Sequence, residues 1–121
     1  MVNTPPINHK ELLNDPEICF PHNSLRGGQA ELVKDIKDTL HNGEKILAHA
    51  PTGLGKTASA LSIAVPLAKK LKKKVFFLTN RHTQHKIVIE TLQEMQEKSG
   101  ELIIVSDIIG KKGMCSQEVA K

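Results

Sequence analysis

The sequence predicts an α/β fold, a parallel β-sheet flanked by helices and present only in part. Apolar residues recur at helical spacing over residues 29–42. Short apolar runs typical of buried strands follow at residues 45–50, 75–79 and 102–106. The elements alternate as helix, strand, helix, strand, helix, strand, and this order predicts a parallel sheet with right-handed crossovers.

Three helices are expected before and between these strands. The first, at residues 29–42, is supported by Gly43 immediately after its end. The second is expected in the apolar stretch 58–73, where Pro66 should kink or end the helix. The third is expected at residues 83–98, which place their apolar side chains on one face.

The 121 residues suffice for one domain. Residues 1–18 are polar and contain three prolines, so we expect an irregular leader before a domain at residues 19–121. Cys19 and Cys115 are too few for a disulfide framework or a four-ligand zinc site. Because the chain shows no secretory signal and no apolar run of about 18 residues, we expect a cytoplasmic protein without membrane contact.

Charge is distributed unevenly along the chain. No Asp or Glu occurs between Lys45 and Ile89, where nine basic residues lie. The remaining residues include eight basic and thirteen acidic ones. A basic block of this kind suits a polyanion, either nucleotide phosphate or a nucleic-acid backbone, although a solvated lysine face would give the same composition.

The segment APTGLGKT, residues 50–57, lies between an expected strand and an expected helix and fits a phosphate-binding loop. Gly53 and Gly55 allow a sharp turn that brings backbone N–H groups to phosphate oxygens. Lys56 supplies a positive charge for the β- and γ-phosphates of ATP, and the Thr57 hydroxyl is a ligand for Mg²⁺. These features predict the P-loop class of nucleotide-binding fold.

Lys56 and Thr57 are the expected catalytic residues of this loop, and Ala50 replaces the first glycine of the general pattern, as is common in helicases. The expected cofactor-binding residues are Phe20, Arg26, Gln29, Pro51, Thr52, Gly53, Leu54, Gly55, Lys56 and Thr57. The competing interpretation is a glycine-rich turn that binds no ligand.

Three further segments carry a resemblance to superfamily 2 helicases of the XPD/DinG iron–sulfur type. The segment FPHNSLRGGQ, residues 20–29, resembles the adenine-recognition motif of that family. Its matching residues are Phe20, Pro21, Arg26 and Gln29, whereas His22 and Gly27 depart from the pattern. A Gln side chain offers both the donor and the acceptor that suit the edge of adenine.

The segment FLTNRHTQ, residues 77–84, resembles the family's loop after the second strand, which implies contact with the nucleic-acid backbone. The implied contact residues are Thr79, Arg81, His82 and Gln84. The segment GKKGMC, residues 110–115, resembles the place where the first cluster cysteine occurs. Cys115 would therefore be one of four [4Fe–4S] ligands, with the other three beyond Lys121.

The resemblance implies a RecA-like ATP-binding domain from the N-terminal part of an ATP-dependent DNA helicase. DNA, single-stranded or forked, is the implied partner, and ATP and Mg²⁺ are the implied cofactors. The 121 residues contain no D-E-x-H motif, so we expect the chain alone to be inactive in hydrolysis. The alternatives are another superfamily 2 translocase, such as a restriction-type or RNA-directed motor, a small-molecule kinase, or a non-catalytic nucleotide-binding module.

Overall fold

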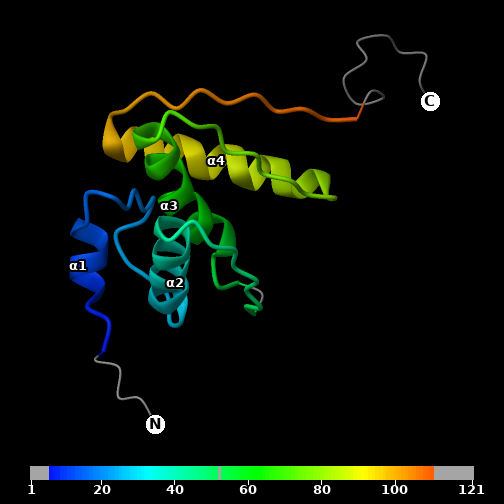
Figure 1. The fold of residues 1–121 in the computed structure, drawn as a ribbon. Helices are drawn as coiled ribbons and strands as arrows, with labels where there is room; N and C mark the ends of the chain where they lie inside the picture. The colour runs from blue at the N-terminus through cyan, green and yellow to red at the C-terminus, as the bar shows by residue number, and fades with distance from the viewer. Residues whose placement is uncertain (1–5, 52, 111–121) are drawn as a thin grey trace, which may run out of the picture.

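The computed structural model describes residues 6–51 and 53–110, and these contain four helices (Figure 1). The helices are α1 (His9–Asn14), α2 (Gln29–His41), α3 (Lys56–Lys70) and α4 (His82–Ser99). Helix α3 is central, because it contacts both α2 and α4, whereas α1 contacts α2. None of the described helices is both long enough and apolar enough to span a bilayer.

The prediction of an α/β fold with a parallel sheet is wrong for this structure. Residues 6–51 and 53–110 contain no β-strand, and the expected strands at 45–50, 75–79 and 102–106 are irregular extended segments. Most of their apolar side chains face solvent: Leu47 is 101% exposed, Phe76 82% and Ile104 87%.

The physical reason is that a strand is defined by its partner and a helix is not. A helix satisfies its backbone groups within itself, whereas a strand needs a neighbour about 4.8 Å away to accept and donate its hydrogen bonds. The three extended segments exchange no backbone hydrogen bonds with one another within the described part of the chain. Apolar runs in the sequence report a preference for burial, but they do not report whether a pairing partner is present.

The helices were better predicted, because their signals are local. The expected helices at 29–42 and 83–98 are confirmed as α2 and α4 to within a residue at each end. Helix α3 begins before its predicted start and continues through Pro66 to Lys70. The expected irregular leader contains the short helix α1, whose start is capped by the Asn8 side chain accepting from the Lys10 N–H at 3.1 Å.

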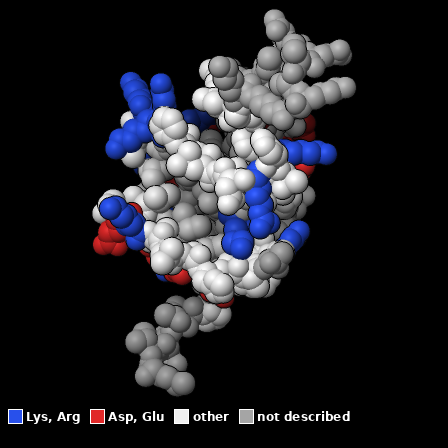
Figure 2. Space-filling model, turned by 90° about the vertical axis from the view of Figure 1, so that its right-hand side faces the viewer, with Lys and Arg blue, Asp and Glu red and all other residues white. Residues whose placement is uncertain are grey.

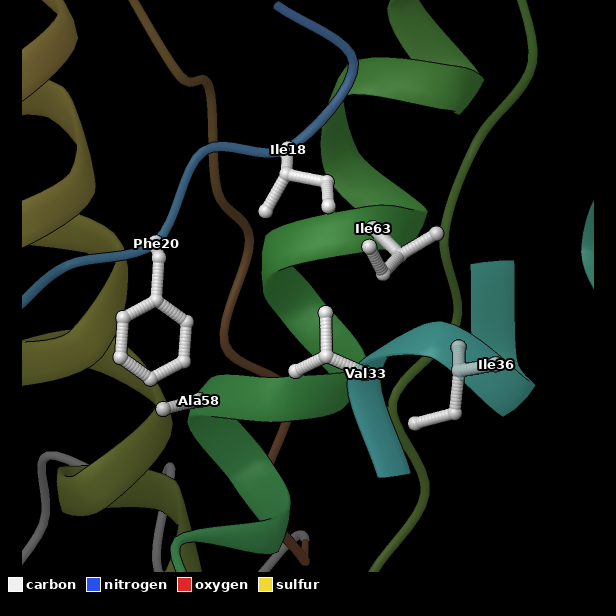
Figure 3. Packing of buried hydrophobic residues seen from close by; sticks show 6 residues of the cluster. All are labelled: Ile18, Phe20, Val33, Ile36, Ala58 and Ile63. Atoms are coloured by element: carbon white, nitrogen blue, oxygen red, sulfur yellow. The ribbon is translucent and has the colours of Figure 1, made fainter. Parts of the chain in front are cut away.

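Two apolar clusters hold the helices together, one on each side of α3. The first joins the segment before α2 to α2 and α3; its buried members are Ile18, Phe20, Val33, Ile36, Ala58 and Ile63 (Figure 3). The second joins α3 to α4; its buried members are Leu61, Val88, Leu92 and Met95. Fixing α3 from both sides also fixes the loop that leads into it.

Pro66 helps to dock the N-terminal segment onto α3. Proline has no N–H, so the carbonyl of Ser62, four residues earlier, lacks its usual partner within the helix. The Cys19 N–H donates to that carbonyl at 2.9 Å. The predicted helix breaker therefore leaves the helix intact and creates an acceptor that holds the segment before residue 20.

Candidate functional site

The loop before α3 turns through two glycines in the left-handed region. Gly53 has φ +85° and Gly55 has φ +79°. Residues other than glycine rarely adopt such positive φ values, so both positions require glycine, as expected. The Leu54 N–H donates to the Pro51 carbonyl at 3.3 Å and closes the turn. Thr52, another expected loop residue, lies outside the described residues.

The N-terminus of α3 has no side-chain cap. Gly55 precedes the helix without a side-chain cap, and the first turn contains no acidic residue. The first N–H groups and the positive end of the helix dipole therefore lack a side-chain acceptor at this end of the described helix. Lys56 is exposed and its Nζ donates to the Ala50 carbonyl at 3.0 Å, while Thr57 is half-buried.

Arg26 and Gln29 both lie against this loop. The Gln29 Nε2 donates to the Gly55 carbonyl at 3.2 Å, and its Oε1 accepts from the Arg26 N–H at 3.0 Å. The Arg26 Nη1 donates to the Gly53 carbonyl at 2.5 Å. The structure thus brings two residues of the 20–29 motif into direct contact with the loop.

Phe20, by contrast, is placed in the core and not on the open side of the loop. It is 2% exposed and packs among residues of α2 and α3 (Figure 3). Its ring meets His22 edge-on, with the ring centres 5.8 Å apart. The carbonyl of His22 accepts from the Lys98 Nζ at 2.9 Å, so this segment is tied to α4 as well.

The second expected site lies at the start of α4. Thr79 Oγ1 accepts from the Arg81 N–H at 3.3 Å, and the Gln84 N–H donates to the Arg81 carbonyl at 3.1 Å. Arg81 and His82 are exposed, and Gln84 is half-buried. The four expected residues are therefore together, in a segment held by hydrogen bonds among its own residues.

Sequence reasoning missed two residues beside this turn. His85 Nδ1 lies 2.5 Å from Asp107 Oδ1, and the His85 ring stacks on His82 with the centres 6.0 Å apart. Residues 101–110 run back along α4 (Figure 1), with the Ile103 N–H donating to Gln96 Oε1 at 2.9 Å. The helical spacing of the two histidines was visible in the sequence, but the approach of Asp107 was not.

The central basic block is partly neutralised by acidic residues from the rest of the chain. Lys69 pairs with Glu101 at 2.8 Å, and Lys70 pairs with Glu17 at 3.3 Å. Lys and Arg side chains stand in separate groups on the face shown in Figure 2, rather than in one continuous patch. The positive charges of Lys69 and Lys70 are therefore offset by these ion pairs, and the other Lys and Arg side chains carry the rest of the positive charge of the block.

Carboxylates anchor the segments that lead to both candidate sites. Burial raises the pKa of Asp15, but hydrogen bonds from Lys37 and from the Glu17 N–H outweigh it, and the pKa falls below its usual value. A hydrogen bond from Lys70 lowers the pKa of Glu17, and one from Lys69 lowers the pKa of Glu101. The hydrogen bond to Asp15 raises the pKa of Lys37.

The expected iron–sulfur ligand cannot be placed. Cys115 lies outside the described residues. Within the part of the chain that is described, no three His, Cys, Asp or Glu side chains are grouped to hold a metal ion. Cys19 is half-buried, and its Sγ donates weakly to the Met95 carbonyl at 3.7 Å.

Comparison with known families assigns the chain to a family. It belongs to the family described as the type III restriction enzyme, res subunit, whose model matches residues 22–117. The match covers both candidate sites and begins within the 20–29 motif. A restriction-type relationship was one of the alternatives that the sequence left open.

The curated relatives carry helicase and nuclease names. The chain is 34% identical over 89 residues to the 3′-5′ exonuclease DinG of Bacillus subtilis, covering 74% of this chain and 9% of DinG. It is 30% identical over 91 residues to the ATP-dependent DNA helicase XPD of Sulfolobus acidocaldarius, covering 75% of this chain and 15% of XPD. The resemblance to the XPD/DinG type is thereby confirmed.

A third relative is a probable ATP-dependent helicase of Methanocaldococcus jannaschii, 27% identical over 103 residues, which are 84% of this chain and 15% of the relative. The chain therefore spans between 9% and 15% of the length of these relatives. No solved structure matches the chain significantly.

Proposed function

We propose that the chain binds Mg·ATP through residues 50–57 and serves as the nucleotide-binding part of an ATP-dependent DNA helicase. The observation that carries the proposal is the uncapped N-terminus of α3, which directly follows two left-handed glycines and begins with Lys56. Such a helix end attracts phosphate through free N–H groups and through the helix dipole.

The residues present fit a magnesium nucleotide. Lys56 is exposed, so its ammonium can leave the Ala50 carbonyl for the β- and γ-phosphates. Thr57 would contribute its hydroxyl to Mg²⁺, which prefers oxygen ligands. Bound Mg²⁺ would offset the charge of the phosphates. The DNA-helicase part of the proposal is supported by the names of the XPD and M. jannaschii relatives.

Nucleic acid would bind at the turn before α4, through backbone contacts from Thr79, Arg81, His82 and Gln84. Arg81 and His82 are exposed there. The Arg81 side chain forms no ion pair with any residue in the described ranges, so its charge is free to meet a phosphate. A [4Fe–4S] cluster with Cys115 as a ligand stays a prediction from the resemblance.

Isothermal titration with Mg·ATP tests the proposal. Lys56→Ala should weaken binding at least about tenfold, because it removes a charge-assisted contact to phosphate. Lys74→Ala is the matched control: it removes an exposed lysine charge a few residues beyond α3 and should leave the affinity unchanged. Equal affinities for wild type and Lys56→Ala would refute the assignment of the loop.

A second candidate is a restriction-type DNA translocase, which the family match favours. It would use the same loop and the same turn but would move along duplex DNA without separating its strands. A strand-displacement assay on the whole protein distinguishes the two, because a helicase releases the displaced strand and a translocase does not.

A further inference from the structure

Three carbonyls of the loop are each held by a side chain. The Ala50 carbonyl accepts from Lys56, the Gly53 carbonyl from Arg26, and the Gly55 carbonyl from Gln29. A carbonyl oxygen carries negative partial charge, so an anion site works only where the carbonyls turn away and the N–H groups face the ligand. Of these donors, Arg26 and Gln29 come from outside the loop and can keep their carbonyls when Lys56 turns to a phosphate.

The Gln29 contact is the most constrained of the three. Gln29 is 2% exposed, and both ends of its amide are occupied by protein backbone. A Cβ atom on Gly55 would lie only 2.5 Å from the Gln29 Nε2. The Gly55 carbonyl also accepts from the Ser59 N–H at 3.1 Å and from the Ser59 Oγ at 2.9 Å, so α3 and Gln29 hold it together.

Arg26 holds a second carbonyl of the loop. Its side chain is exposed, yet it reaches the Gly53 carbonyl at 2.5 Å. Its own N–H is the donor to Gln29 Oε1. Arg26 and Gln29 thus form one connected unit, which we name the carbonyl clamp, on the two loop glycines Gly53 and Gly55.

We propose that Arg26 and Gln29 are positioning residues for phosphate, whose effect on binding does not depend on the base of the nucleotide. The inference rests on the proposed phosphate binding by residues 50–57. It differs from adenine recognition by Gln29, because loss of a residue that recognises the base would weaken the binding of adenine nucleotides alone. The clamp acts on the backbone that meets the phosphates and therefore affects every ligand bearing a triphosphate.

The test compares three ligands, namely Mg·ATP, Mg·GTP and inorganic tripolyphosphate with Mg²⁺, by calorimetry. Gln29→Glu keeps the acceptor for the Arg26 N–H but replaces the Nε2 donor with an oxygen that repels the Gly55 carbonyl. We expect the affinity for all three ligands to fall by the same factor, about tenfold. A loss confined to ATP, with tripolyphosphate binding unchanged, overturns the proposal.

Gln96→Glu is the matched control, because it makes the same change on α4 and keeps the oxygen that accepts from the Ile103 N–H. It should leave all three affinities unchanged. If Gln29→Glu fails to fold, a variant of the exposed Arg26 tests the proposal instead. Arg26→Lys keeps the positive charge but loses the geometry that reaches Gly53, and it should weaken all three ligands equally; an unchanged tripolyphosphate affinity overturns the proposal.

Failure of the underlying function looks different. If the folded wild-type protein binds none of the three ligands, residues 50–57 are not a phosphate site, and the proposed function falls before the clamp is tested. If the wild type binds tripolyphosphate, the proposed loop stands, and only the ligand pattern of the variants decides the role of the clamp.

Discussion

The two candidate sites differ in how they are held. The loop at residues 50–57 has hydrogen bonds of its own but is also held from outside, by side chains of Arg26 and Gln29 that lie more than twenty residues earlier. The turn at residues 79–84 is held from within, by hydrogen bonds between its own residues. Its tie to a distant segment runs through a neighbour, where His85 meets Asp107.

The difference matches what each site would have to do. Several N–H groups must point at one phosphate group together, and this requires a backbone that is fixed before the ligand arrives. Contacts to a nucleic-acid backbone depend mainly on charge and tolerate adjustment of the side chains. Substitutions in the clamped loop should therefore have large effects that depend on geometry, and substitutions in the turn should have smaller effects that depend on salt.

The largest effect is expected for a glycine series in and near the loop. Gly55→Ala adds a side chain at φ +79° and forces it against Gln29, so we expect a loss of about 3 kcal/mol in the free energy of unfolding and loss of ATP binding. Gly53→Ala has the same backbone strain at φ +85° but open space around it, and should cost about 1 kcal/mol.

Gly27→Ala completes the series as the control, since its Cβ would meet nothing within 4 Å. It should change stability by less than about 0.5 kcal/mol. Urea unfolding and calorimetry with Mg·ATP measure both quantities. Equal losses for Gly55→Ala and Gly53→Ala would show that Gln29 does not constrain Gly55.

An intermediate effect is expected at the turn before α4. Binding of unrelated single-stranded oligonucleotides should weaken steeply with salt, and Arg81→Ala should reduce the slope of log K against log salt by about 0.7, the value for one phosphate contact. Fluorescence anisotropy at several salt concentrations measures this slope.

Lys34→Ala serves as the control for the turn, because Lys34 lies on α2 and pairs with Asp38 at 3.1 Å. Its slope should equal that of the wild type. An unchanged slope for Arg81→Ala would place the nucleic-acid contact elsewhere.

The smallest effect is expected for a change of pH, because pH acts on the ion pairs of Asp15, Glu17 and Glu101 and not on the two sites themselves. The pKa values of Asp15, Glu17 and Glu101 are lowered by their lysine partners. A lowered pKa gives stability that is present above the pKa of the unfolded chain and is lost as the pH falls through the folded pKa. We therefore expect the free energy of unfolding to decrease below about pH 4.

Lys37→Met measures how much the ion pair between Lys37 and Asp15 contributes to stability. It should lower stability at pH 7 by less than about 1 kcal/mol and flatten the acid dependence, because Asp15 loses its partner. Lys34→Met removes an exposed lysine from the same helix and serves as the control. Thermal unfolding between pH 3 and pH 7 checks both, and identical pH profiles for Lys37→Met and wild type would argue against the anchor.

The loop was predictable from sequence because its requirements are local. Two glycines, Lys56 and the start of a helix occur within a few residues, and each follows from backbone sterics or helix electrostatics. Gln29 and Arg26 were assigned to the same site through a motif. Their contacts with the Gly55 and Gly53 carbonyls could not be predicted, since these depend on how α2 packs against α3.

By itself the sequence determined the three longer helices, the glycine turn and the basic block, because helix periodicity, positive φ and charge are properties of neighbouring residues. Only the tertiary structure decided that residues 45–50, 75–79 and 102–106 do not pair as strands, that Phe20 is buried, and that Asp107 reaches His85. Each of these depends on a partner distant in the chain. Local preference does not specify such partners, because the packing of whole helices selects which distant groups come within hydrogen-bonding or van der Waals distance.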